Sequence, residues 1–146
     1  MARASRLLLS SVITLWTVAA LAAGAPFSTI EQGSASGVTS PTTLVIKSEE
    51  EWQALWARHA AVRAPTPGPP QIDFSREMVI AVFAGERTTG GFTVEVTAID
   101  VSSGAIRVTY HESDPPPDSF LTQALTQPYH LVTTPRVEGP ITFQAR

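Results

Sequence analysis

The fold of this chain is decided by one continuously apolar stretch, Met78-Val79-Ile80-Ala81-Val82-Phe83-Ala84. A charged segment precedes the stretch and Gly85 ends it, and the stretch is too short for a typical helix. A strand that lacks polar residues at alternate positions has both of its faces covered by other elements. We therefore predict a central strand that is buried on both faces.

The segments after this strand predict a β-hairpin. Residues 92–98 alternate between apolar and polar, and the phase reverses at Ile99, which predicts a β-bulge near Ala98. Ser102-Ser103-Gly104 closes the hairpin, and residues 106–110 alternate again in the returning strand. A proline-rich break at residues 114–118 then precedes two further predicted strands, at 129–133 and at 141–144.

A helix is predicted upstream, directly after a short β-branched strand at residues 43–46. Ser48 is a good N-cap, and Glu51 three residues later completes a capping box. The apolar face of the helix is formed by Trp52, Leu55, Trp56 and His59, at i, i+3, i+4 and i+7. Two tryptophans one turn apart can also form an aromatic ligand platform, but this spacing is far more often a core contact. The proline-rich segment 63–71 ends the helix.

These elements predict an α+β domain with one N-terminal helix packed on an antiparallel β-sheet. Residues 23–40 are rich in Gly, Ser, Ala and Thr, so we expect a flexible lead-in or a weak first strand there. The structured domain is then expected to span residues 41–146.

The first residues have the pattern of a secretory signal peptide. Arg3 and Arg6 give a positive start, residues 7–19 form an apolar core too short to span a bilayer comfortably, and Ala20-Leu21-Ala22 offers a cleavage site. We expect residues 1–22 to be removed and the protein to be secreted or periplasmic. The alternative is an uncleaved anchor, in which case the membrane is contacted through this segment only.

The composition excludes several classes of function. The formal net charge is −3, and it becomes −5 when the two arginines of the signal segment are lost. Lys47 is the only lysine, so a basic patch for nucleic acid or for an anionic membrane is missing. The chain has no cysteine, which excludes disulfides, thiol nucleophiles and a lipid-attachment cysteine.

Two polar segments flank the predicted core strands and are candidates for function. In Gly85-Glu86-Arg87-Thr88-Thr89-Gly90-Gly91-Phe92, Gly91 stands where a phosphate-binding loop requires lysine, so nucleotide binding is excluded. A glycine pair is otherwise used where the backbone needs a positive φ or where another chain comes close. A tight turn and a contact with a partner therefore both remain open for this segment.

The second segment is Thr126-Gln127-Pro128-Tyr129-His130. Tyr129 and His130 point to opposite faces of a strand, so we expect one of them to be exposed. Catalysis by His130 would need a positioned acid or nucleophile, and no such motif supports it. A metal site would need His59, His111 and His130 to converge, but they share no ligand spacing. We expect no catalytic residue, no metal and no cofactor.

These two segments resemble the C-terminal domain of the PrcB family of protease-complex subunits. Members of that family carry a G-x-R-P-T-G-G-Y type loop and a T-Q-P-Y-H type strand. Here Thr88 replaces the usual proline and Phe92 the usual tyrosine, and the second motif matches at every position. The resemblance covers roughly Leu44 to the C-terminus.

The resemblance implies an exported, non-catalytic accessory protein that stabilises a protease complex or assists its maturation. Its partner is then a protein, with an exported protease as one candidate. The expected partner-binding residues are Arg87, Thr88, Thr89, Gly90, Gly91, Gln127, Tyr129 and His130. Two alternatives stay open. Thr88-Thr89-Gly90 is similar to the loop of chagasin-like protease inhibitors, and Trp52, Trp56 and Tyr129 could serve a cell-envelope ligand-binding module.

Overall fold

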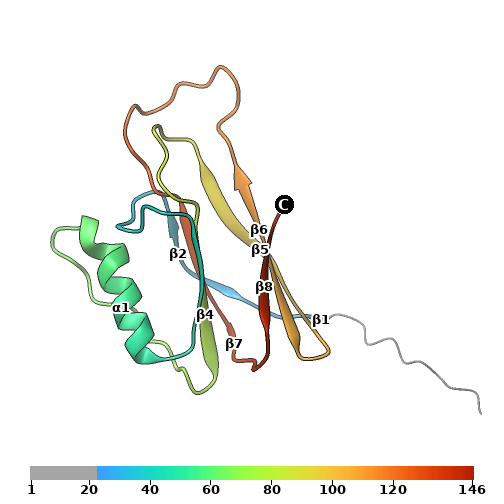
Figure 1. Ribbon diagram of the computed structural model, residues 1–146. Helices are drawn as coiled ribbons and strands as arrows, with labels where there is room; N and C mark the ends of the chain where they lie inside the picture. The colour runs from blue at the N-terminus through green and yellow to red at the C-terminus, as the bar shows by residue number, and fades with distance from the viewer. Residues whose placement is uncertain (1–22) are drawn as a thin grey trace, which may run out of the picture.

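The computed structural model describes residues 23–146, in which one helix and two four-stranded sheets form three layers (Figure 1). The predicted signal peptide at residues 1–22 lies outside the described residues. In chain order the elements are β1 (Ala23–Gly24), β2 (Ser28–Gly33), β3 (Thr42–Ile46), α1 (Glu49–His59), the 3-10 helix η1 (Ala60–Val62), β4 (Glu77–Phe83), β5 (Thr93–Ser102), β6 (Ala105–Ser113), β7 (Tyr129–Pro135) and β8 (Ile141–Ala145).

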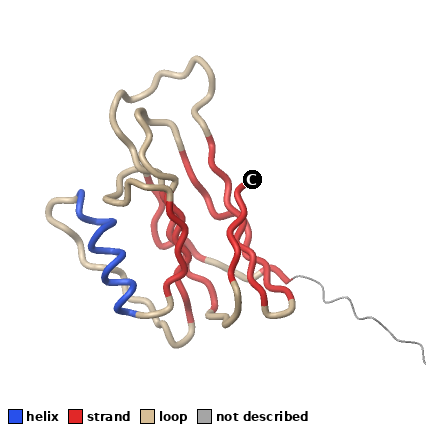
Figure 2. Tube along the Cα trace, viewed as in Figure 1, coloured by secondary structure: helices blue, strands red, loops and turns tan. Residues whose placement is uncertain are grey.

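The two sheets lie face to face, and α1 covers the free face of one of them (Figure 2). The central sheet has the strand order β2-β7-β4-β3, and the outer sheet has the order β1-β5-β6-β8. Strands β6 and β8 run parallel, and the other neighbouring pairs are antiparallel. The N-terminal segment contributes β1 to the outer sheet and β2 to the central sheet, so it belongs to both layers.

This arrangement corrects part of the predicted fold class. The chain is α+β, but α1 is not N-terminal because three strands precede it, and there are two sheets where one was predicted. The outer sheet is also mixed, because β8 runs parallel to β6. Alternation along a strand reports that one face is buried but not which element lies across it. The sequence pattern therefore located the strands without revealing that they belong to two sheets.

Strand β4 is central and buried on both faces, as predicted. It lies between β7 and β3, and every residue from Met78 to Phe83 is buried. Its side chains that face α1 are Val79, Ala81 and Phe83, and those that face the outer sheet are Met78, Ile80 and Val82. Two hydrophobic cores thus share one strand, which explains why it has no polar position.

The predicted cap and apolar face of α1 are confirmed. The Glu51 backbone N–H donates to Ser48 Oγ at 3.2 Å, and the Glu51 carboxylate accepts from the Lys47 backbone N–H at 3.1 Å. The buried residues of the helix are Trp52, Leu55, Trp56 and His59. The indole N–H groups of the two tryptophans donate to the carbonyls of Pro70 and Pro67, both at 2.9 Å. The proline-rich connection is thereby held against the helix.

The predicted hairpin and bulge are also confirmed. The register between β5 and β6 shifts between Val96 and Ala98. The turn places Ser103 at φ 51° and Gly104 at φ 76°, the pair of positive values that a tight hairpin turn of the primed type requires.

Residues 23–40 contain more structure than their composition indicates. Strands β1 and β2 lie in this range, and Ser36 and Val38 are buried beneath the end of α1. The segment packs tightly at Gly37, where a Cβ would lie 2.0 Å from the Arg58 carbonyl oxygen. No helix within residues 23–146 is long and apolar enough to cross a membrane.

Candidate functional site

The two sequence motifs lie side by side at one end of the molecule. The backbone N–H of Arg87 donates to the carbonyl of Thr126 at 2.8 Å, and the N–H of Thr126 donates back to the carbonyl of Arg87 at 2.9 Å. This bridge joins the β4–β5 connection, residues 84–92, to the β6–β7 connection, residues 114–128. We call these two connections together the loop tip, which projects beyond both sheets in Figure 1.

Further hydrogen bonds brace the loop tip. The Thr126 hydroxyl donates to the Thr89 carbonyl at 2.7 Å, and the Gly90 N–H donates to the Thr122 carbonyl at 2.9 Å. The Gln127 side-chain amide donates to the Glu86 carboxylate at 3.0 Å. Because each bond joins one connection to the other, the loops hold one another in place although neither has regular secondary structure.

Gly91 is required by this packing. Its φ is +92°, and a Cβ at this position would lie 2.7 Å from Pro115 Cβ and 3.0 Å from Leu121 Cδ2. Such a distance is shorter than a real Cβ contact, and the backbone conformation is one that favours glycine. Gly91 therefore serves the close approach of the second loop of the same chain, whereas a Cβ on Gly90 would find its nearest contact at an ordinary 3.4 Å.

Arg87 braces the loop tip from its side. Its guanidinium pairs with the Glu112 carboxylate at 3.2 Å and lies 5.6 Å from the ring centroid of Phe92. The side chain is half-buried, so its charge is engaged within the chain. The exposed residues of the motif are Glu86, Thr88 and Gly91.

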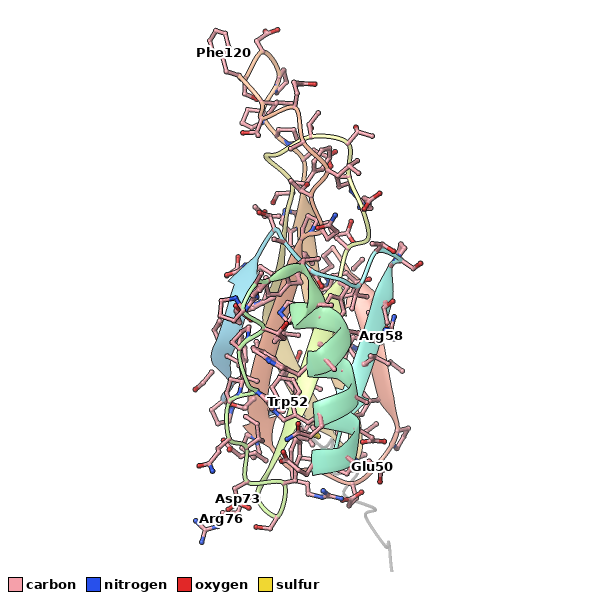
Figure 3. All side chains as sticks on the ribbon, turned by 90° about the vertical axis from the view of Figure 1, so that its left-hand side faces the viewer. Glu50, Trp52, Arg58, Asp73, Arg76 and Phe120 are labelled. Atoms are coloured by element: carbon pink, nitrogen blue, oxygen red, sulfur yellow. The ribbon has the colours of Figure 1, made fainter. Side chains whose placement is uncertain are left out.

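The exposed apolar side chains of the loop tip come from its proline-flanked loop. Phe120 is fully exposed, with a relative accessibility of 106%, and Leu125 is 62% exposed. Figure 3 shows Phe120 at the far end of the molecule, pointing away from the sheets. Sequence reasoning missed both residues, because a loop has no periodicity that separates an inward from an outward apolar residue.

Tyr129 and His130 lie in the core, which corrects the expectation that one of them is exposed. They point to opposite faces of β7 as predicted, but both faces of the central sheet are covered. Tyr129 lies under α1, and burial, together with the charge of Glu31, raises the pKa of its hydroxyl to about 12. Neither side chain can contribute to a surface.

Tyr129 is part of a partly buried polar network that the sequence did not reveal. Glu31 on β2 accepts from Arg63 at 2.6 Å and lies 3.0 Å from His59 Nε2, and Arg63 also donates to the Tyr129 hydroxyl at 3.2 Å. His59 Nδ1 lies 2.9 Å from the hydroxyl of Ser36. The network joins α1, β2, β7 and the β2–β3 connection, so it locks the helix onto the central sheet.

A serine, a histidine and a carboxylate in a row also invite comparison with a hydrolase. The Ser36 hydroxyl is fully buried and accepts a hydrogen bond from the Val38 backbone N–H at 3.1 Å. The imidazole of His59 is fully buried as well, and burial lowers its pKa. A substrate carbonyl must come within reach of the nucleophile for acyl transfer. Here that space is filled by protein, so the arrangement is structural.

His130 occupies the other core, between the two sheets. Its Nδ1 accepts from the Val96 backbone N–H at 2.8 Å, and its Nε2 lies 2.8 Å from the Thr29 hydroxyl. An acceptor at Nδ1 leaves the proton on Nε2, so the imidazole is neutral. Burial accordingly lowers the pKa of His130. The side chain satisfies the backbone N–H at the β5 bulge.

The remaining predicted sites have these positions. Trp52 and Trp56 are buried with Tyr129 under α1, so a ligand platform built from these three rings has no accessible face. The carbonyl of Thr89 and the N–H of Gly90 are both engaged within the loop tip, so the chagasin-like loop has little backbone left to offer. Among residues 23–146, no group of three or more His, Asp or Glu side chains could hold a metal ion.

Comparison with known proteins supports the resemblance read from the motifs. The family model described as PrcB C-terminal matches residues 78–135, from the start of β4 to the end of β7. The match includes both motifs and covers less than half of the chain, and it supports the assignment of this segment to the PrcB C-terminal family. No curated protein and no solved structure matches the chain.

Proposed function

We propose that this protein is an exported, non-catalytic accessory protein whose loop tip binds a protein partner and thereby stabilises a protease complex or assists its maturation. The family match suggests an accessory role of this kind. The observation that carries the proposal is the full exposure of Phe120 at the end of a cross-braced loop.

An exposed aromatic side chain on a rigid support suits an interface anchor. Aromatic residues are enriched among the few side chains that dominate binding energy. Ordering a mobile loop on binding costs free energy, and this cost is smaller where the loop is already braced. The bonds between Arg87 and Thr126 provide such bracing in the unbound chain.

The absence of catalysis is the second part of the proposal, and it is supported by geometry. In the arrangement that most resembles a hydrolytic site, Ser36 with His59 and Glu31, the serine and the histidine are fully buried. Purified protein is therefore expected to leave peptide and ester substrates intact. Hydrolysis that disappears in a Ser36→Ala variant of preserved fold would contradict this part.

The experiment is affinity capture from the native cell envelope, followed by mass spectrometry of the captured proteins. A double variant, Phe120→Ser with Leu125→Ser, removes the exposed apolar side chains of the loop tip. The matched control is Val62→Ser, because Val62 is also a large exposed hydrophobic residue, at 54%, but lies on η1 and not in the loop tip.

We expect the wild type and the Val62 control to capture the same exported protease, and the double variant to lose it. Equal capture by all three would show that the loop tip is not the binding surface. Capture of a protein unrelated to proteolysis, lost in the double variant, would keep the loop tip as the interface and overturn the protease-complex role. The intact mass of the bait tests export, because Ala23 is then its first residue.

A further inference from the structure

We propose that the protein forms a two-fold symmetric dimer in which strand β3 pairs antiparallel with β3 of a second copy, joining the two central sheets into one. This surface is separate from the loop tip. The inference begins with the edges of the two sheets, because an unpaired edge strand presents free backbone groups that pair readily with another chain.

Two of the exposed edges are blocked by the chain itself. β1 pairs with β5 at Asp100 and Val101. Beside that pairing, the carbonyl of Val94 accepts from the Gln32 side chain at 2.9 Å, and the N–H of Val96 donates to His130. On β2, the register shifts between Thr29 and Glu31, and the Glu31 carboxylate turns toward α1. Bulges, inward-facing charges and covering side chains are the devices by which edges avoid pairing.

Strand β3 has none of these devices at its centre. Residues 43–45 are Thr, Leu and Val, and the strand that pairs with β3 in the described part of the chain is β4. Within residues 23–146, no hydrogen bond from another segment reaches the backbone of Thr43 or Val45. The edge is continuous and regular.

The backbone groups that face outward can be assigned. The N–H of Ala84 donates to the Pro128 carbonyl, on the β7 side of β4. Because backbone groups in a strand alternate in direction, Ala81 points its groups toward β3, where its partner is Leu44. Thr43 and Val45 therefore direct their N–H and C=O groups away from the sheet.

A two-fold axis beside Leu44 satisfies all four of these groups. Thr43 of one copy then faces Val45 of the other, and each such pair exchanges two hydrogen bonds. Leu44 faces its own symmetry mate as a closely spaced pair without hydrogen bonds. Leu44 is half-buried and packs at the border of the core under α1, so its exposed part becomes covered.

The helix beside β3 has a charge pattern that matches the same axis. A groove of about 310 Å³ runs between β3 and α1, and its helix side is formed by Glu51, Ala54 and Arg58. Figure 3 shows Arg58 on this side of the helix. A two-fold axis reverses the direction of the second helix, so Glu51 of one copy faces Arg58 of the other across the small side chain of Ala54. This charge complementarity identifies a second copy of the chain as the occupant of the groove.

Sedimentation velocity over a concentration series tests the proposal with three variants of the purified protein. Thr43→Pro removes an N–H that points away from the sheet, because the hydrogen bonds between β3 and β4 come from the even-numbered residues of β3. Proline is accepted at such an edge position. Arg58→Glu places like charges across the axis, and Arg58→Glu with Glu51→Arg restores opposite charges. Gln53→Glu is the control, since Gln53 is exposed on α1 but does not line the groove.

We expect the wild type to be a dimer and Thr43→Pro to be a monomer with an unchanged far-UV spectrum. Arg58→Glu should raise the Kd of the dimer about ten-fold or more. The double charge swap should lower the Kd again relative to Arg58→Glu, although it also removes the carboxylate that accepts from the Lys47 N–H at the start of α1. Gln53→Glu should match the wild type. A wild type that stays monomeric throughout, or a dimer indifferent to Thr43→Pro, overturns the proposal. So does a monomer whose β3 edge instead binds another protein in a manner abolished by Thr43→Pro.

Discussion

His130 and Arg87 belong to the two motifs of one family, yet they lie in opposite surroundings. His130 is enclosed between two sheets with both ring nitrogens hydrogen-bonded. Arg87 lies in a projecting loop, where it pairs with Glu112 and braces the loop tip. The two motifs therefore have separate tasks. The motif with His130 joins the two sheets, and the motif with Arg87 and Gly91 shapes a surface.

The largest expected effect is the loss of stability when the buried His130 is replaced. His130→Ala leaves the Val96 N–H without a partner and opens a cavity between the sheets. We expect the free energy of unfolding to fall by about 3 kcal/mol, from the lost hydrogen bonds and the cavity together. Chemical denaturation measures it, with His111→Ala on the exposed side of β6 as the control. Equal losses of stability for the two substitutions would show that His130 does not contribute more to the fold than the exposed His111.

Substitution of the loop-tip glycines is expected to have an intermediate effect on stability, which should differ between the neighbours Gly90 and Gly91. Gly91→Ala forces a positive φ on alanine and brings Cβ against Pro115, so we expect a loss of about 1–3 kcal/mol. Gly90→Ala is the matched control, because its Cβ would find its nearest contact at 3.4 Å, an ordinary distance. Hydrogen exchange at the Thr126 amide should accelerate in Gly91→Ala only. Similar exchange in both variants would show that the loops are not braced as described.

A smaller effect is expected from pH. Burial holds the pKa of His130 below its usual value near 6.5, with Glu95 opposing this shift. Between the folded and the unfolded pKa the unfolded chain binds more protons, so stability falls as the pH decreases below about 6.5 and this contribution levels off below the folded pKa. His130→Asn should reduce the fall in denaturation midpoints between pH 7 and pH 5, and the remainder belongs to His59, whose pKa burial also lowers. An unchanged slope would mean that His130 is not the titrating group.

The smallest effect on stability is expected at the end of the loop tip. Phe120→Ser removes a side chain that is fully exposed and packs against nothing else within residues 23–146. The free energy of unfolding should therefore change by less than about 0.5 kcal/mol. Thermal melting of the variant beside the wild type measures it. A clear loss of melting temperature would place Phe120 in the architecture and weaken its assignment as an interface anchor.

Local patterns in the sequence were sufficient for most of the elements. The capping residue Ser48, the apolar face of α1 and the uninterrupted β4 each follow from the spacing of a few residues, and the structure has them as predicted. The β-bulge was also predictable, because the alternation of apolar and polar residues reverses its phase at Ile99.

Long-range contacts left no such signal. Glu31 meets His59 across 28 positions, and His130 meets Thr29 across 101. Neither pair shares a motif or a spacing. The same reason explains why Tyr129 and His130 were expected at the surface: alternation assigns them to opposite faces, but it does not report that both faces of the central sheet are covered.

The sharing of the N-terminal segment between the two sheets has a consequence for the order of folding. The hairpin of β5 and β6, and the β3–α1–β4 unit, can form from residues close in sequence. Strand β2 must wait for β7, about a hundred residues later, and Thr134 on β7 also bonds back to the Pro26 carbonyl. Because distant pairings are the slow ones, closure of both sheets by residues 23–33 is expected to be the final step. Until that step the β5 bulge and the open side of β7 stay uncovered.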